Sequence, residues 1–177
     1  FQEPAFVLNF DARGSTRAVP MFETHPGNHA SIKRLINDLA FPRITTSLAV
    51  TVYRLLPNAT DFNVWDQRMG WAGFNFATIG GAHRYHTPED IPDNLSDGML
   101  QHMGDHVLQM QHALDNLDEA GMAGLGPDAE AADDAVFFDL FGIVVVYFSE
   151  SIQRMLAVTA LISCLASIIL SKSIPRI

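Results

Sequence analysis

Residues 70–108 read GWAGFNFATIGGAHRYHTPEDIPDNLSDGMLQHMGDHVL, in which an apolar run, a glycine pair, a polar loop and a helical pattern follow one another. The apolar run at residues 73–79 predicts a buried strand that ends at the glycine pair. Ser96 or Asp97 can cap a helix through Leu117, because apolar residues recur there at helical spacing. The expected stripe is Leu100, Met103, Val107, Met110 and Leu114. This order predicts one unit of an α/β sheet.

The preceding residues continue the alternation of strands and helices. Short runs of apolar or β-forming residues predict three more strands, at residues 5–10, 19–22 and 48–53. Two segments predict helices: residues 28–40, with Asn28 as N-cap, and residues 60–68, capped by Thr60 or Asp61. We therefore expect an α/β fold, with a partial sheet, mixed or parallel, flanked by helices over residues 1–120.

Three segments of different character follow. Residues 121–135 are small and acidic and contain glycine and proline, as is typical of a linker. Residues 136–150 are apolar but too short to cross a bilayer, so we expect them at a membrane interface, with Phe137, Phe138, Phe141 and Tyr147 near the headgroups.

An uncharged stretch at residues 155–171 predicts a C-terminal membrane helix. At ~1.5 Å per residue it spans roughly 25 Å, and a start at Ile152 brings it near the ~30 Å of a hydrocarbon core. A buried amphipathic helix is the alternative, but only small Ser and Thr residues provide polarity. We expect the membrane helix at residues 152–171.

Charge and cysteine content narrow the functional classes. All 20 acidic residues but only 8 of the 11 Lys and Arg residues lie in residues 1–150, which gives this part a net charge of −12. An acidic domain disfavours nucleic-acid binding, which needs basic surface. The single Cys164 excludes an internal disulfide and a Cys-based zinc site.

Polar residues follow the predicted strands at positions where ligands collect in open α/β sheets. Asp11 directly follows the run VLNF, His86 lies in the loop after residues 73–79, and residues 56–62 follow the predicted strand at 48–53. A carboxylate and an imidazole at one sheet edge suit zinc. On spacing alone, turn and loop roles for these residues are more common. His102 and His106 stand at i, i+4, but without a base or third ligand a solvated helix face explains them better.

The segments LNFDARG, MFETHPGN, LPNATDF and the stretch at residues 70–108 resemble, in this order, the second half of the catalytic domain of co-catalytic zinc peptidases. That family includes bacterial leucyl aminopeptidases, glutamate carboxypeptidase and glutaminyl cyclase. The resemblance covers residues 5–118 and is strongest to the membrane-anchored branch of endoplasmic reticulum metallopeptidases and fungal vacuolar membrane proteases. It implies a zinc exopeptidase-like but incomplete fold, two zinc ions in the intact domain and a peptide substrate.

The resemblance also implies roles for individual residues. Asp11 matches the acidic ligand of one zinc and His86 the histidine ligand of the other. Tyr85 matches a residue whose hydroxyl, in some relatives, points at the substrate carbonyl and would stabilise the developing oxyanion. Asp90 could orient His86 or its loop, with a turn role as the alternative.

Two further residues are expected beside the pocket. Asp61 matches a loop that borders it in the family, and Arg13 either lines the pocket or pairs with an acidic neighbour. Ala59 departs from the Asp of several relatives, which puts a catalytic carboxylate at that position in doubt.

In that family the preceding half of the domain supplies a His-x-Asp pair and a Glu-Glu pair, and neither motif occurs in these 177 residues. Each zinc would keep one of its usual three protein ligands, and no base would activate water. We therefore expect this chain, without the N-terminal half as partner, to be inactive, and its parent to be a membrane-bound exopeptidase, of aminopeptidase type. The alternatives are a non-catalytic binding module and a glutaminyl cyclase.

Charges around the membrane helix predict its orientation. Lys172 and Arg176 follow the helix and Arg154 precedes it. Because positive residues favour the cytoplasmic side, we expect the peptidase domain on the extracytoplasmic or lumenal side.

Overall fold

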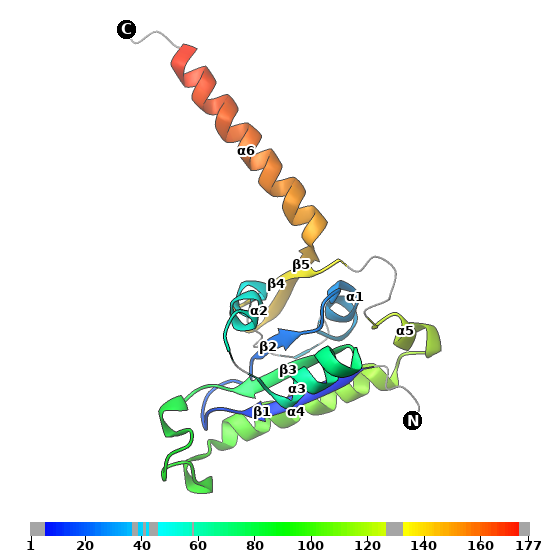
Figure 1. Ribbon diagram of the computed structural model, residues 1–177, viewed down its shortest axis with the longest axis vertical. Coiled ribbons are helices and arrows are strands. Elements are labelled where there is room, and N and C mark those ends of the chain that lie inside the picture. The colour runs from blue at the N-terminus through cyan, green and yellow to red at the C-terminus, as the bar shows by residue number, and fades with distance from the viewer. Residues whose placement is uncertain are drawn as a thin grey trace.

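The computed structural model describes residues 6–36, 39–40, 42, 46–57, 59–126 and 133–173 (Figure 1). These residues form a three-stranded sheet with helices on both sides, a two-stranded hairpin and a long C-terminal helix. The expected α/β class with a partly parallel sheet is confirmed. Parts of the predicted first strand, first helix, pocket loop and linker (residues 5, 37–38, 58 and 127–132) lie outside the described residues.

The three-stranded sheet has the order β1–β3–β2. β1 (Val7–Ala12) runs parallel to the central β3 (Gly73–Thr78), and β2 (Met21–Thr24) runs antiparallel to it. All six residues of β3 are buried, which explains its continuous apolar run. In the parallel pair Asp11 lies opposite Ala77, so the two strands end at the same edge of the sheet.

The long helix α4 (Asp97–Asp115) packs along one side of the sheet, and α1 (His29–Ser31) and α2 (Ser47–Arg54) lie on the other (Figure 1). The helix begins after Ser96, as predicted, although the Ser96 side chain makes no capping hydrogen bond, and it ends at Asp115 and not at Leu117. Its buried face is rotated from the predicted one. Leu100 of the expected stripe is 48% exposed, whereas Met99, Met110 and His106 are buried. The imidazole of His106 packs against Phe76 with ring centroids 5.5 Å apart, so it is a core residue and not part of a solvated face.

α2 corrects the strand predicted at residues 48–53. Thr46 caps the helix by accepting a hydrogen bond from the Ala49 amide, and Val50 is buried against the domain. β-branched residues disfavour a helix by only a few tenths of a kcal/mol each, so a cap and a packed face outweigh them.

The other helices are short. Ile32–Ile36 (η1) and Val64–Arg68 (η2) are wound as π-helix, and Ala82–Arg84 (η3) and Pro92–Asn94 (η4) are 3-10 turns. Thr60 caps α3 (Asp61–Asn63) in a capping box, as expected. α5 (Glu119–Ala123) and the buried Leu125 replace the start of the expected linker.

Residues 136–150 form most of a β-hairpin that the sequence did not predict. β4 (Ala135–Leu140) pairs antiparallel with β5 (Val144–Ser149) around a turn in which Phe141 and Gly142 have positive φ. Phe137 is 1% exposed and belongs to the core, so its expected place among lipid headgroups is wrong, whereas Phe141 at the turn is 93% exposed.

The hairpin leads directly into α6 (Glu150–Ser173). Its segment Glu150–Leu170 is long and apolar enough to cross a membrane, with a mean hydropathy of 1.8, and none of it is buried against the domain. α6 projects from the domain as a single rod (Figure 1).

Candidate active site

The shared edge of β1 and β3 carries the candidate site. The loop after β1 and the loop after β3 are held together there by backbone contacts. The Ser15 and Thr16 amides both donate to the Gly80 carbonyl oxygen, at 2.8 and 3.0 Å. A Cβ at Gly14 would overlap the same carbonyl group, so glycine is required for this close approach.

Side chains reinforce the same junction. The Thr78 hydroxyl donates to the Gly14 carbonyl at 2.6 Å, and Arg84 donates to the Ser15 hydroxyl at 3.1 Å. The Ser96 amide, at the start of α4, donates to the Ser15 carbonyl at 2.9 Å. Residues far apart in the sequence are thereby fixed beside the end of β1.

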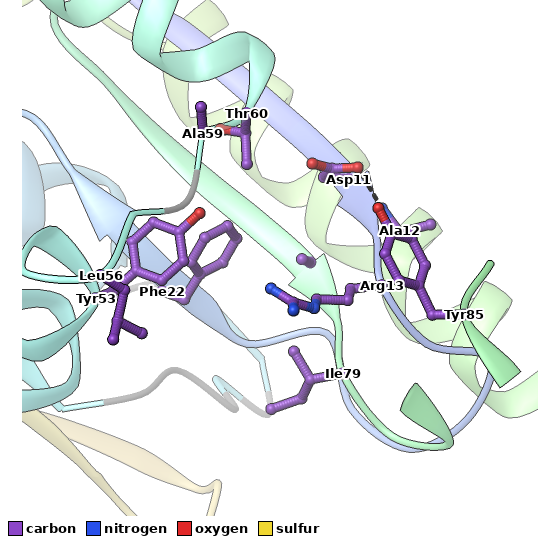
Figure 2. Close-up of a pocket in the computed structure, with 11 residues that line it drawn as sticks. Asp11, Ala12, Arg13, Phe22, Tyr53, Leu56, Ala59, Thr60, Ile79 and Tyr85 are labelled. Atoms are coloured by element: carbon purple, nitrogen blue, oxygen red, sulfur yellow. Dashed lines mark hydrogen bonds between the residues drawn. The ribbon is translucent and has the colours of Figure 1, made fainter. Parts of the chain in front are cut away.

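A cavity of about 410 Å³ opens at this edge (Figure 2). Asp11, Arg13 and Tyr85 line one side, and Phe22, Tyr53 and Leu56 line the other. Ala59, Thr60 and Ile79 complete much of the wall. The cavity therefore combines a carboxylate, a guanidinium and two phenols with an apolar wall.

The structure brings three of the predicted site residues into this cavity. The Arg13 guanidinium carbon lies 5.7 Å from the centre of the Tyr85 ring, a geometry that allows a cation–π contact. Asp11 accepts a hydrogen bond from the Ala12 amide at 2.7 Å, which fixes its carboxylate at the end of β1. Arg13 thus lines the pocket, one of the two roles expected of it.

The other predicted residues lie outside the cavity lining. His86 is exposed, has a φ of 58° and stacks on Tyr85 with ring centroids 3.9 Å apart. Asp90 is exposed and closes a turn with Thr87, and Asp61 is the exposed first residue of α3. Among the described residues, no three His, Cys, Asp or Glu side chains are grouped to hold a metal ion.

A buried polar network supports one wall of the cavity and was missed in the sequence. Glu23 is 5% exposed, and its carboxylate accepts hydrogen bonds from the side-chain amide groups of Asn63, at 3.1 Å, and Asn75, at 3.0 Å. Asn75 also donates to the Thr60 hydroxyl at 2.8 Å, and Asn9 donates to Asn75 at 2.8 Å. The available signal was a polar residue inside the runs at residues 5–10 and 73–79, and another directly after the run at residues 19–22.

The network also affects the electrostatics of the cavity. Burial raises the pKa of Tyr53, and the negative charge of Glu23 raises it further, while Arg13 opposes the shift. Tyr53 therefore remains a neutral phenol, able to donate a hydrogen bond, over an extended alkaline range.

Comparison with known proteins places this region in a family. Residues 2–111 match the family profile described as Peptidase family M28. A vacuolar membrane protease of Leptosphaeria maculans is 32% identical over 61% of this chain and 13% of its own length. A Caenorhabditis elegans protein named for endoplasmic reticulum metallopeptidase 1-B is 25% identical over 90% of this chain and 17% of its own length.

The chain thus spans less than a fifth of these relatives, and no solved structure matches it significantly. The match with the worm protein also extends past the family profile toward the hairpin and α6. Since the profile covers more than half of the residues, the chain belongs to peptidase family M28.

Proposed function

We propose that residues 1–120 form the C-terminal part of the catalytic domain of a zinc-dependent exopeptidase of aminopeptidase type. One observation carries the proposal: Asp11 and Tyr85 line one cavity at the carboxyl ends of two parallel strands, inside the region that matches the family. This is the position at which open α/β sheets bind ligands.

Asp11 and His86 are the proposed zinc ligands, one for each of two ions. Their carboxylate and imidazole groups are of the types that zinc accepts. When bound, zinc lowers the pKa of coordinated water and polarises a carbonyl group. The described residues contain no group of three such side chains, so each zinc site needs ligands beyond Asp11 and His86.

The other cavity residues have proposed roles in holding the peptide. The Tyr85 hydroxyl would donate a hydrogen bond to the substrate carbonyl oxygen as negative charge develops there. Arg13, beside the Tyr85 ring, limits the orientations available to that ring. Phe22, Leu56 and Ile79 form an apolar wall that excludes water from the bound peptide.

We further propose that α6 crosses the membrane, with the peptidase domain on the lumenal or extracytoplasmic side. The support is the length and mean hydropathy of Glu150–Leu170, and the membrane protease names of the relatives. Lys172 and Arg176 follow the helix and Arg154 alone precedes it, so the positive-inside rule adds a margin of one charge in the same direction.

The direct test compares two proteins in sealed vesicles: the complete gene product that contains residues 1–177, and residues 1–177 alone. Free aminoacyl, N-blocked and N-terminal glutaminyl peptides are the substrates. We expect chelator-sensitive release of the N-terminal residue from the free peptides by the complete product only. Cleavage of blocked peptides alone, cyclisation of glutaminyl peptides, or full activity of the 177-residue chain would each contradict the proposal.

A further inference from the structure

α2 has an apolar face that no described residue covers. Leu48, Val52 and Leu55 stand at i, i+4 and i+7, so they form one stripe along the helix. Their exposed fractions are 70%, 49% and 81%. On the opposite side, Val50 is only 4% exposed. The stripe is thus distinct from the face that packs on the domain.

The exposed stripe of α2 carries no charge. The only charged residue of the helix is Arg54, and its guanidinium turns toward the domain, where it donates to the Thr24 carbonyl oxygen at 2.7 Å. No acidic residue occurs in α2, in a chain whose net charge is −9. The stripe therefore presents only apolar groups to its surroundings.

α2 lies next to the N-terminal end of α6. Ser47 and Leu48 line a cavity of about 390 Å³ together with Glu150 and Gln153 of the first turn of α6. The Phe137 amide of the hairpin, which leads into α6, donates to the Ser47 hydroxyl at 3.3 Å. α6 leans toward the side of the domain that carries α2 (Figure 1). A bilayer entered by α6 would therefore begin close to the stripe.

We propose that Leu48, Val52 and Leu55 dock on the lipid surface of the membrane that α6 enters. An amphipathic helix with an uncharged apolar face gains free energy by burying that face at the boundary between headgroups and acyl chains. Because the stripe begins beside the N-terminal end of α6, where that helix would enter the bilayer, lipid is the proposed occupant.

This docking would fix the position of the candidate active site. Tyr53 and Leu56, at the other end of α2, line the cavity that contains Asp11 and Tyr85. If that cavity binds peptides, which is the proposed function above, docking places its mouth beside the lipid surface. The substrates would then be peptides held at or near the membrane.

The experiment uses the 177-residue chain, reconstituted in vesicles. Cys164→Ser removes its single cysteine. One environment-sensitive fluorophore is then attached to an introduced cysteine. Leu55→Cys reports on the stripe. Leu108→Cys is the matched control, since Leu108 is 67% exposed on α4, away from α6. Leu161→Cys, in the middle of α6, reports separately on membrane insertion. Vesicles contain lipids brominated either near the headgroup or near the end of the acyl chain.

We expect the Leu55→Cys label to emit at shorter wavelength and to lose most of its emission with lipids brominated near the headgroup. The Leu108→Cys label should show neither effect, and the Leu161→Cys label should be quenched by lipids brominated at the chain end. If brominated lipid quenches the label at Leu161→Cys but not the label at Leu55→Cys, the docking proposal is overturned, whereas the proposed membrane span of α6 is not. A short-wavelength emission from Leu55→Cys that brominated lipid does not quench means that protein covers the stripe, and also overturns it. None of these readouts depends on peptidase activity.

Discussion

Glu23→Gln is the most informative single change, because it alters hydrogen bonding without altering shape. The two carboxylate oxygens of Glu23 each accept one hydrogen bond, from Asn63 at 3.1 Å and from Asn75 at 3.0 Å. A glutamine in the same position offers one acceptor oxygen and one NH₂ group. One of the two asparagine donors would then face another donor in a site where Glu23 is 5% exposed and Asn75 is fully buried.

The magnitude follows from the hydrogen bond that is lost. A hydrogen bond to a charged group contributes about 1.5–3 kcal/mol, and a buried donor left unsatisfied costs a similar amount. We therefore expect Glu23→Gln to lower the free energy of unfolding by about 2 kcal/mol, or roughly 30-fold in the folding equilibrium. No cavity is created, so the loss reports on hydrogen bonding and charge, and not on packing.

Urea unfolding of the chain in detergent micelles, followed by tryptophan fluorescence, measures this loss. The two tryptophans, Trp65 and Trp71, stack with ring centroids 5.0 Å apart; Trp65 lies within the π-helical segment that follows Asn63. Glu89→Gln removes the same charge from an exposed loop and is the control. Equal midpoints for Glu23→Gln and Glu89→Gln would refute the claim that the buried network holds the cavity wall.

Four further predictions test the site, the core and the membrane helix. The 177-residue chain should retain less than one equivalent of zinc after desalting, because only Asp11 and His86 are proposed as ligands; tight stoichiometric zinc by metal analysis would contradict this. In the complete enzyme His86→Ala should abolish peptide hydrolysis, whereas Tyr85→Phe should lower kcat by about 10²–10³-fold with zinc content unchanged. His25 directly follows β2 and is 1% exposed. Burial lowers its pKa, so its neutral form stabilises the fold above the usual pKa of about 6.5 and this stability declines as pH falls below it. The urea midpoint should then fall between pH 7.5 and pH 5.5, and less steeply in His25→Gln; parallel curves would exclude a role for His25. Proteolysis of sealed vesicles should cut residues 1–150 from the lumenal or extracytoplasmic side only, and digestion from the cytoplasmic side alone would reverse the topology.

Elements with a strong local signal were predictable from the sequence. The continuous run GFNFAT identifies β3 because a central strand is buried on both faces. Thr60 identifies the start of α3 because a capping box satisfies backbone amides that would otherwise lack partners. The charge-free stretch inside α6 identifies a helix of membrane length.

Elements set by tertiary contacts were not predictable. The segment LAVTVY has the composition of a strand, and only the Thr46 cap and the buried Val50 make it helix α2. His106 occupies a core position that hydropathy assigns to an apolar residue, which is why the buried face of α4 was misplaced. Hydropathy alone also could not separate a hairpin that packs on the domain from a segment that lies on lipid.

The same distinction between local sequence signals and tertiary contacts applies to the residues of the candidate site. Asp11 and Tyr85 could be proposed from the sequence because they occupy positions with a recognisable family pattern, and both line one cavity. Glu23 and Asn75 were missed because their importance lies in contacts between strands that are 52 residues apart in the sequence. A polar residue inside an apolar strand is the only local trace of such a network.

The hairpin gives α6 a fixed relation to the domain that carries the candidate site. The Asp134 carboxylate accepts a hydrogen bond from the Gly27 amide at 2.7 Å, and the Ala135 amide donates to the Asn28 side chain at 2.8 Å. The Asp134 carbonyl oxygen also accepts a hydrogen bond from the Glu150 amide at 2.9 Å. Residues 134–135 therefore join the domain to the first residue of α6. A helix tethered by a flexible linker would let the cavity take any orientation over the membrane. Because these bonds connect α6 to β2 through a single turn, the orientation of the cavity is instead a property of the fold.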